Sequence, residues 1–540
     1  MTLMTRRGLL GAGTLLGSAP LAARAPAPVE ADWESLSDHF RTPDWFRDAK
    51  LGIWSHWGPQ CVPEWGDWYA RKMYVQGTPF YDHHLKTYGH PANTGFIEII
   101  GRWRADKWQP EVLAAKFKAA GARYLVSMAN HHDNFDNFAS RFHSWNSTRV
   151  GPRCDIVGTW AKVARAEGLR FGVSNHAAHA WHWLQAAYGY DPEGPRRGQR
   201  YDAFRLRKAD GRGKYWQGLD PQALYTGPSM VVPDGISTIA KMDEWHLAND
   251  RKWTEAAPAS NPGFSRNWLA RQIDLVRRYD PDLVYFDNEG LPLDNFGLEA
   301  AAHYYNHSIA RHGRLEGVLT GKKLSDGQRR AITEDVERGW SADIRPQPWQ
   351  TCTCIGDWHY DRKIFDSKSY KTAEQVIQRL CDVVSKNGNL LLSVPQRGDG
   401  SIDAEEEKML AGMTAWIAVN GEAVFASRPW ARYGEGPVRP VEGMMNEART
   451  SAFTAQDLRF TVREGKLYAA VMVWPKDPLR IASLAAGASP VQVRRVSLLG
   501  GGQVPFTQDG SGLLVTLPES AKGAFVPVLR IEGEGIAAGA

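Results

Sequence analysis

Short apolar runs alternate with segments of helical periodicity over most of the chain, from about Trp33 to about Val424. Such runs predict buried strands, and the amphipathic segments between them predict helices that cover a sheet. Strand–helix alternation over this length favours a parallel sheet in an α/β fold, most economically a (β/α)8-like barrel. The predicted strands are 51–54, 124–128, 169–174, 283–286, 331–334 and 390–394, and the predicted helices are 107–120, 156–167, 268–278 and 373–385.

The pattern changes after about Pro429, where short β-type runs are separated by Gly, Pro and Asp. These runs, at 458–463, 467–474, 491–498 and 513–517, predict a C-terminal antiparallel β-sandwich. Residues 29–428 are therefore expected to form the catalytic barrel and residues 429–540 the β-sandwich, in which no catalytic motif stands out. The irregular stretch 188–219 predicts loops over the barrel mouth.

The first residues predict an export signal, with Arg6 and Arg7 ahead of an apolar, small-residue run that ends near a small-x-small site at 23–25. This pattern resembles a twin-arginine signal, so residues 1–28 are expected to be removed and the protein to be periplasmic or secreted. The apolar run is too short to span a bilayer, as is every later segment. The alternatives are an uncleaved anchor and a basic start that arose by chance.

Composition narrows the class of ligand. The formal net charge of +5 over 540 residues, without a basic tract, argues against nucleic acid. The 22 Trp suit a carbohydrate enzyme, because apolar sugar faces pack on aromatic rings, although large aromatic cores also use Trp. The five cysteines cannot all pair and lack zinc-site spacing, so no metal site built on cysteine is expected. No cofactor is expected either.

Asp287 directly follows the predicted strand 283–286, which places it at the carboxyl end, where α/β barrels carry their chemistry. Its surroundings belong to a series of motifs that resembles the α-L-fucosidases of glycoside hydrolase family 29. The motifs occur in the family's order and are WFRDAKLGIWSHWG (45–58), VPEWGDWYAR (62–71), AGARY (120–124), NHHD (130–133), GPRCD (151–155), PDLVYFD (281–287) and GNLLLSV (388–394). The resemblance implies a barrel followed by a β-sandwich, and an exo-acting retaining hydrolase of fucosylated oligosaccharides or glycoconjugates.

A retaining glycosidase needs two carboxyl groups roughly 5 Å apart. Asp287 matches the family's nucleophile. Glu337, in the stretch EDVERG (334–339), is our choice for the acid/base, with Glu334 as the alternative. If the strand continues, these two glutamates face opposite sides, so only one can reach the substrate.

The resemblance also implies a set of sugar-binding residues. His56, His131 and His132 match positions that bind sugar hydroxyls, and the adjacent pair can share a pocket only where the strand ends. The further expected substrate contacts are Asp67, Trp68, His176 and Tyr285, whereas Trp54 and Trp57 are expected in the core.

Two departures from the family pattern stand out. Residues 172–180 read GVSNHAAHA where many members have GVYYS, so His176 or His179 is expected to replace a tyrosine that orients the nucleophile. Gln350 stands where Glu is common. Both departures are expected near the pocket, where they bear on sugar and linkage preference.

Three other functions remain open. Another exo-glycosidase activity, such as a galactosidase, fits the same scaffold. A metal-dependent barrel hydrolase would use His131, His132, Asp133, His176, His179 and Asp287. A sugar-binding relative without activity would need Asp287 or the acid to be absent, and both are present.

Overall fold

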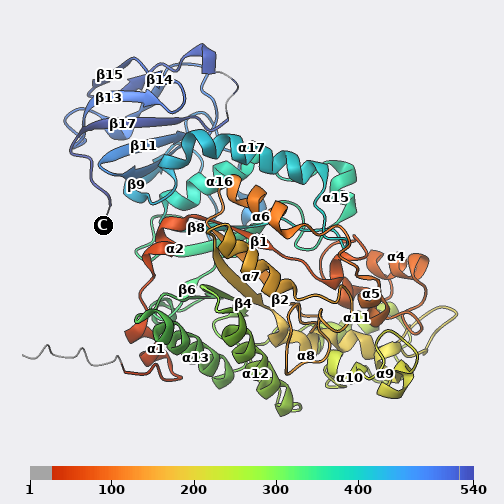
Figure 1. Ribbon diagram of the computed structural model, residues 1–540. Coiled ribbons are helices and arrows are strands. Elements are labelled where there is room, and N and C mark those ends of the chain that lie inside the picture. Colours follow the sequence, from red (N-terminus) through yellow and green to blue (C-terminus); the bar gives the residue numbers. More distant parts are fainter. Residues whose placement is uncertain (1–26, 522, 524, 540) are drawn as a thin grey trace, which may run out of the picture.

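The computed structural model describes residues 27–521, 523 and 525–539. Nearly all of the predicted export signal at 1–28 therefore lies outside the described residues. The described part forms a large α/β body and a smaller all-β lobe, which Figure 1 shows at the C-terminal end of the chain.

A parallel sheet of eight strands forms the centre of the larger body. Along the sheet the order is β6-β5-β4-β3-β2-β1-β8-β7. The edge strands β6 and β7 are joined by a parallel bridge between Asp335 and Gln350 and by a hydrogen bond from the Val336 N–H to the Gln350 carbonyl at 2.8 Å. The sheet thus closes into the predicted (β/α)8-like barrel. Its strands are β1 (Leu51–Ser55), β2 (Tyr124–Asn130), β3 (Arg170–Asn175), β4 (Leu283–Glu289), β5 (Val318–Lys322), β6 (Thr333–Glu334), β7 (Trp349–Cys354) and β8 (Gly388–Ser393).

Side-chain alternation along these strands separates two cores. Trp54, Tyr124, Leu283 and Tyr285 belong to the cluster that fills the barrel interior, whereas Leu51 and Ile53 of β1 pack outward in the main core. Both faces are apolar because helices cover the outside of the barrel.

Gly52 shows how tightly the interior is filled. A Cβ on Gly52 would lie 2.2 Å from the Tyr124 ring, so the interior position that this tyrosine occupies leaves no room for a side chain on β1.

The helices that cover the barrel follow most of the strands. Sequence predicted α7, α12 and α16, and α6 begins at Pro110 rather than at 107, because proline suits the first helical position. Residues 335–348, all described, connect β6 to β7 without a helix. The helices around the barrel are α1 (Trp33–His39), α2 (Asp44–Ala49), α6 (Pro110–Ala119), α7 (Ile156–Ala166), α12 (Pro262–Tyr279), α13 (Asn295–His312), α14 (Asp326–Arg329), α15 (Arg362–Ser367), α16 (Ala373–Ser385) and α17 (Ala404–Asn420).

Two long connections build an additional layer at one end of the barrel, to the lower right in Figure 1. One lies between β1 and α6 and the other between β3 and α12. The predicted loop 188–219 is part of the second and includes the short helix α9. The helices of this layer are α3 (Tyr69–Lys72), α4 (Pro79–Thr87), α5 (Phe96–Arg102), α8 (Ala180–Trp183), α9 (Asp202–Arg205), α10 (Pro221–Leu224) and α11 (Ile239–Ala248). Within the described part of the chain, none of the helices combines the length and apolar character that crossing a membrane requires.

The C-terminal lobe confirms the predicted β-sandwich. A six-stranded antiparallel sheet in the order β14-β13-β17-β11-β10-β9 and a three-stranded sheet in the order β12-β16-β15 enclose a separate apolar core. The strands are β9 (Arg428–Glu435), β10 (Leu458–Arg463), β11 (Lys466–Val471), β12 (Leu479–Ile481), β13 (Gln492–Leu498), β14 (Gly502–Gln503), β15 (Phe506–Asp509), β16 (Gly512–Val515) and β17 (Val528–Glu534).

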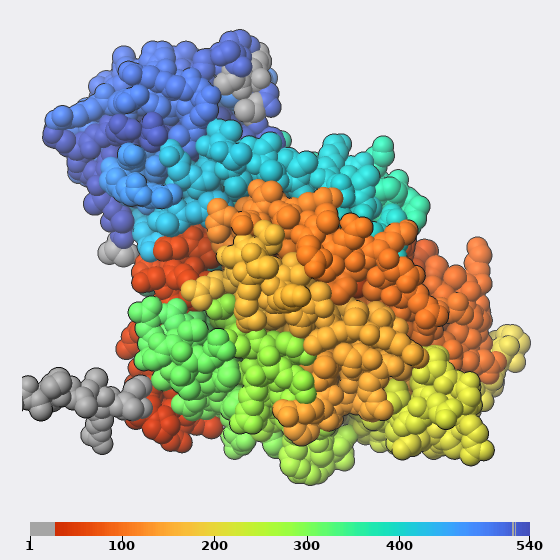
Figure 2. Space-filling view, viewed as in Figure 1, coloured from red at the N-terminus to blue at the C-terminus, as the bar shows by residue number. Residues whose placement is uncertain are grey.

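The outer face of the six-stranded sheet packs on the barrel body. Along β11, Leu467 and Ala469 point into the sandwich core, whereas Tyr468 and Ala470 join the core shared with the barrel helices. Arg459 of β10, also buried on this side, forms an ion pair with Asp382 of α16 at 2.6 Å. Figure 2 shows the lobe resting on the α16–α17 side of the body, and the buried pair ties the two together.

Candidate active site

A cavity of about 480 Å³ opens at the carboxyl ends of the barrel strands. Although the alternatives Glu334 and His179 do not line it, this one cavity contains all nine residues chosen from the sequence for catalysis or sugar binding. They are His56, Asp67, Trp68, His131, His132, His176, Tyr285, Asp287 and Glu337.

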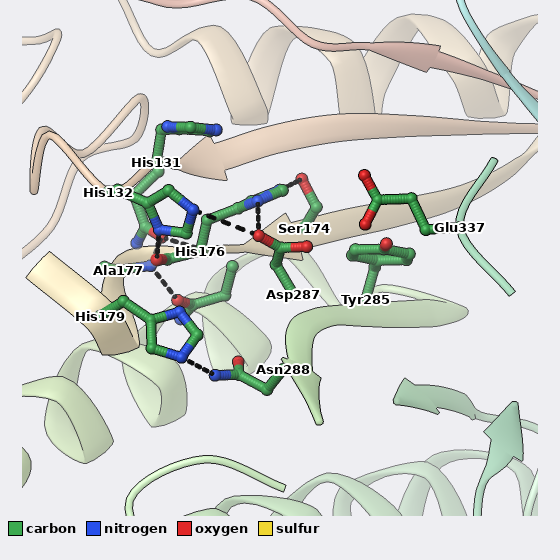
Figure 3. Close-up of polar contacts among 12 residues, drawn as sticks. His131, His132, Ser174, His176, Ala177, His179, Tyr285, Asp287, Asn288 and Glu337 are labelled. Atoms are coloured by element: carbon green, nitrogen blue, oxygen red, sulfur yellow. Dashed lines mark hydrogen bonds and ion pairs between the residues drawn. The ribbon is translucent and has the colours of Figure 1, made fainter. Parts of the chain in front are cut away.

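Asp287 lies near the end of β4 with its side chain 14 % exposed. One carboxylate oxygen lies 3.3 Å from Nε2 of His132 and 3.2 Å from Nδ1 of His176, and the other contacts Nζ of Lys322 (Figure 3 shows the two histidines beside Asp287). Burial alone would raise the pKa of Asp287, but Lys322 and the two histidines hold that pKa well below its usual value. Asp287 is therefore ionised across the neutral and mildly acidic range.

Glu337 faces Asp287 across the same cavity (Figure 3), and its carboxylate contacts Nζ of Lys322 as well. Since both carboxylates contact one nitrogen atom, ordinary hydrogen-bond lengths place their facing oxygens within about 6 Å of each other. Retaining glycosidases separate their carboxyl groups by about 5–5.5 Å, and inverting ones by about 6.5–9.5 Å. This upper bound lies below the inverting range and fits the closer approach of a retaining pair.

Lys322 is a buried cation whose charge is matched by these two anions. Burial would lower its pKa, but Asp287 and Glu337 together raise the pKa of the Lys322 ammonium well above its usual value. The amine is therefore charged at neutral pH, and it contacts both carboxylates.

Glu334, the alternative acid, lies elsewhere. Its carboxylate pairs with Arg329 at 2.8 Å and with Arg345 at 2.5 Å, and it accepts a hydrogen bond from the Leu324 N–H at 3.1 Å. β6 ends at Glu334, and Glu337 follows after the strand has ended. Of the two glutamates, only Glu337 lines the cavity that contains Asp287.

Buried imidazoles form the closed end of the cavity. β2 ends at Asn130, which allows the adjacent His131 and His132 to enter the same pocket, as the sequence predicted. Burial lowers the pKa of His176 to about 4 and the pKa values of His56 and His131 well below 6.5. These three rings are neutral at pH 7, and a neutral imidazole can both donate to and accept from a hydroxyl group.

The wall beside these imidazoles is formed by Asp67 and Trp68. His359, buried behind the wall, donates from Nδ1 to the Asp67 carboxylate at 2.5 Å, and the Asp67 N–H donates to Asp357 at 3.0 Å. Trp68 has a left-handed backbone, with φ at 65°, and its ring lies parallel to that of Trp253 at 6.3 Å. Apolar ring faces thus stand beside the polar end of the cavity.

Tyr285 and Trp54 form the floor. The Tyr285 hydroxyl donates to Asp335 at 3.2 Å, and its ring lies 4.7 Å from that of Trp54. The prediction that Trp54 is a core residue is incomplete, because Trp54 fills the barrel interior and also lines the cavity. Trp57 lies in the core, as predicted, with its indole N–H donating to the Arg397 carbonyl at 2.8 Å.

Some of these donors could also coordinate a metal ion. Their ligand atoms lie within 4.8 Å of one another in two overlapping groups, namely His56, Asp67, His131 and His359, and His131, His132 and His176. Within the first group Asp67 is hydrogen-bonded to His359, whose Nε2 has no hydrogen-bond partner among the described residues. Among the described residues, the ring nitrogens of His56 have no hydrogen-bond partner.

Two protein families match separate parts of this sequence. The family described as "Alpha-L-fucosidase" matches residues 18–422, and the one described as "Alpha-L-fucosidase C-terminal domain" matches residues 451–532. The chain belongs to the alpha-L-fucosidase family. The first match spans the barrel and the second lies within the β-sandwich.

Individual relatives agree with this fucosidase assignment over the full length. The tissue alpha-L-fucosidase of Rattus norvegicus is 26 % identical over 528 residues, which cover 96 % of this chain and 95 % of the relative. The crystal structure of the Thermotoga maritima alpha-fucosidase superposes with a TM-score of 0.65 at 24 % identity, covering 93 % of this chain and 99 % of that one. This second likeness shows that the fold is the same.

The two departures from the fucosidase pattern have distinct structural consequences. His176, where many fucosidases have tyrosine, contacts Asp287, whereas His179 pairs with Glu255 at 3.0 Å outside the cavity. Gln350 is buried in the barrel interior and donates to Asp335 at 2.9 Å. Gln350 therefore contacts the same carboxylate as Tyr285, beneath the cavity floor, and does not line the fucosidase pocket.

Several cavity residues of this fucosidase were missed by the sequence analysis. Lys322 ends β5, a strand that was not predicted. The sequence did contain a signal for Lys322, because this lysine ends a short apolar run that follows the predicted nucleophile strand. The other missed lining residues are Lys72, Trp253, Asn288, Glu289, Arg338, Asp357, Trp358, Met444 and Met445.

Proposed function

We propose that this protein is an exo-acting retaining α-L-fucosidase that removes terminal fucose from oligosaccharides or glycoconjugates. The observation that carries the proposal is the pair Asp287 and Glu337, held by one lysine at the mouth of a pocket that neutral histidines close. A closed pocket suits an enzyme that takes the last sugar of a chain. A structure of the T. maritima relative is in complex with fucose, which supports the choice of sugar.

In the first step, Asp287 attacks the anomeric carbon and forms a glycosyl-enzyme. Its ionised state, which Lys322, His132 and His176 maintain, provides the nucleophile without prior proton transfer. The rings of His132 and His176 also fix the carboxylate orientation, since both lie within 3.3 Å of the same oxygen.

Glu337 protonates the leaving oxygen in this step and deprotonates the attacking water in the next. The glycosidic oxygen must approach the carboxylate that contacts Lys322 in the free enzyme. Substrate binding therefore replaces the contact between Glu337 and Lys322, while the contact between Lys322 and Asp287 remains. Once separated from the ammonium, Glu337 takes up a proton from solvent, and this is the proton that it donates to the leaving oxygen.

His56, His131, Asp67 and Trp68 bind the sugar in this proposal. The two imidazoles supply donors and acceptors for hydroxyls, and Trp68 packs against an apolar face of the ring. Tyr285 supports the floor beneath the reacting carbon. No step of this scheme needs a cofactor.

We also infer that the protein is exported through a twin-arginine signal and acts in the periplasm or outside the cell. Arg6 and Arg7 before the apolar run support this inference. The division into a catalytic barrel up to residue 428 and a β-sandwich from 429 is supported by β9, which begins at Arg428.

A panel of nitrophenyl glycosides assayed with the purified enzyme tests the proposal. We expect turnover of the α-L-fucoside and little of the α- and β-galactosides. Hydrolysis of a galactoside without hydrolysis of the fucoside would assign a different exo-glycosidase activity to the same scaffold.

A further inference from the structure

A segment from the C-terminal part of the chain contributes to the cavity. Residues 443–447, which lie between β9 and β10 and which we call the methionine segment, place Met444 and Met445 on the cavity wall. Met445 is 60 % exposed, the largest value among the exposed large apolar side chains of the described residues. Because Met444 and Met445 also line the cavity, their apolar surface is accessible to a ligand bound there.

The methionine segment is joined by its backbone to the stretch that carries Glu337. The Met445 N–H donates to the Glu337 carbonyl at 2.9 Å, and the Glu447 N–H donates to the Arg338 carbonyl at 2.9 Å. The approach is so close that a Cβ on Gly339 would lie 2.2 Å from the Gly443 carbonyl oxygen. Any side chain at position 339 would force these two chain segments apart.

A buried carboxylate anchors the end of the methionine segment. Glu447 is 13 % exposed and lies 3.3 Å from Arg338, 3.3 Å from Lys371 and 3.1 Å from Arg379. It also accepts a hydrogen bond from the Thr353 hydroxyl at 3.0 Å. The segment is therefore a fixed part of the cavity wall, and the position of Met445 follows that of Glu337.

The side of the cavity decides what Met445 contacts. In a retaining glycosidase the nucleophile and the acid act from opposite faces of the sugar, and the leaving group lies on the side of the acid. The other exposed apolar residue at the mouth, Trp253, belongs to the nucleophile's side, because its ring lies 5.4 Å from that of His132. Met445, in contrast to Trp253, lies on the side of Glu337.

We propose that Met444 and Met445 form the subsite for the leaving group, and that this subsite selects leaving groups that present an apolar surface, such as an aryl group or the C–H face of a second sugar. The inference rests on the proposed function. Methionine suits this role, because its flexible, polarisable side chain adapts to ring faces of different shape. The closed end of the cavity then recognises the fucose, and a residue from beyond the barrel recognises what the fucose is attached to.

Kinetics of Met445→Ala on two fucosides test this subsite. 4-Nitrophenyl α-L-fucoside carries an aryl group, whereas α-L-fucosyl fluoride carries a leaving group too small to reach Met445. We expect kcat/KM for the aryl fucoside to fall about five- to tenfold, mainly through KM, as the loss of a partly covered methionine predicts. The value for the fluoride and the inhibition constant of free L-fucose should stay within about twofold.

Two further variants make the test specific. Met445→Leu keeps the apolar surface and should recover most of the loss on the aryl fucoside. Val441→Ala removes an exposed apolar side chain, 39 % exposed, from the same connection outside the cavity, and should change neither substrate. An equal loss on both fucosides, or no loss on either, would overturn the subsite. Failure of the wild-type enzyme on both fucosides would instead overturn the proposed function and the subsite with it.

Discussion

Replacing Lys322 by Met removes the cation that lies between the two carboxylates proposed as nucleophile and acid/base, and keeps a chain of similar length. In the wild-type enzyme this cation holds the pKa of Asp287 well below its usual value. Without it, burial raises the pKa of Asp287, and the neighbouring carboxylate of Glu337 raises it further. Protonated Asp287 cannot attack, so the acidic limb of the kcat/KM profile should move to higher pH.

The size of the shift follows from the geometry. An opposite charge within about 4–6 Å typically changes a carboxyl pKa by about 1–3 units, and each unit corresponds to about 1.4 kcal/mol. Lys322 contacts Asp287 directly and is itself 6 % exposed, so solvent screens the pair poorly. We expect the acidic limb to move upward by about 2 units, with a loss of about 100-fold in kcat/KM near the lower end of the wild-type range.

The assay is the pH dependence of kcat/KM on an activated aryl fucoside for wild type, Lys322→Met and Lys322→Arg. The arginine variant keeps the charge and should keep an acidic limb close to that of wild type. Lys323→Met is the matched control, because the adjacent Lys323 is 56 % exposed and pairs with Glu289 instead. An unchanged acidic limb in Lys322→Met, in a protein that unfolds at the wild-type temperature, would refute the electrostatic role of Lys322.

Three further predictions concern the same cavity. Asp287→Gly should abolish nearly all turnover, and azide should partly restore it by occupying the vacated space and giving an azido-sugar of inverted configuration; near-wild-type kcat would place the nucleophile elsewhere. Glu337→Gln should slow fucosides with poor leaving groups far more than activated aryl fucosides. Glu334→Gln disturbs only an arginine-paired carboxylate and should show no such dependence on the leaving group, and the reverse pattern would exchange the roles of the two glutamates. The pKa of His176 is about 4 in the folded protein and about 6.5 when unfolded, so its contribution of roughly 3 kcal/mol to the free energy of unfolding is lost as the pH falls from 6.5 to 4. His176→Gln should therefore flatten the fall in unfolding free energy over that range, and an equally steep fall would contradict this.

The sequence predicted the site where a functional motif directly followed an element with a strong pattern. Asp287 follows four apolar residues, and His131 and His132 follow a strand that ends at Asn130, so their common cavity could be expected from barrel geometry. The barrel and the β-sandwich could be predicted for the same reason, since their alternation extends over many elements.

The missed residues lie where local pattern is weak or the contact is distant in sequence. β5 has five residues and ends in glycine and lysine, so Lys322 resembled the start of a loop. Trp54 belongs to a strand that is apolar on both faces, and alternation cannot show which face borders the cavity. Met445 reaches the cavity through contacts with residues more than a hundred positions earlier, which no local pattern indicates.

The central claim is that Asp287 forms a covalent bond to the sugar during hydrolysis. Incubation with 2-deoxy-2-fluoro-α-L-fucosyl fluoride, whose glycosyl-enzyme turns over slowly, followed by peptide mass spectrometry, tests this claim most directly. We predict inactivation with one fluorofucosyl group attached to the peptide that contains Asp287, and protection by L-fucose. Attachment to a different carboxylate, or hydrolysis with inversion and without any covalent adduct, would contradict the account.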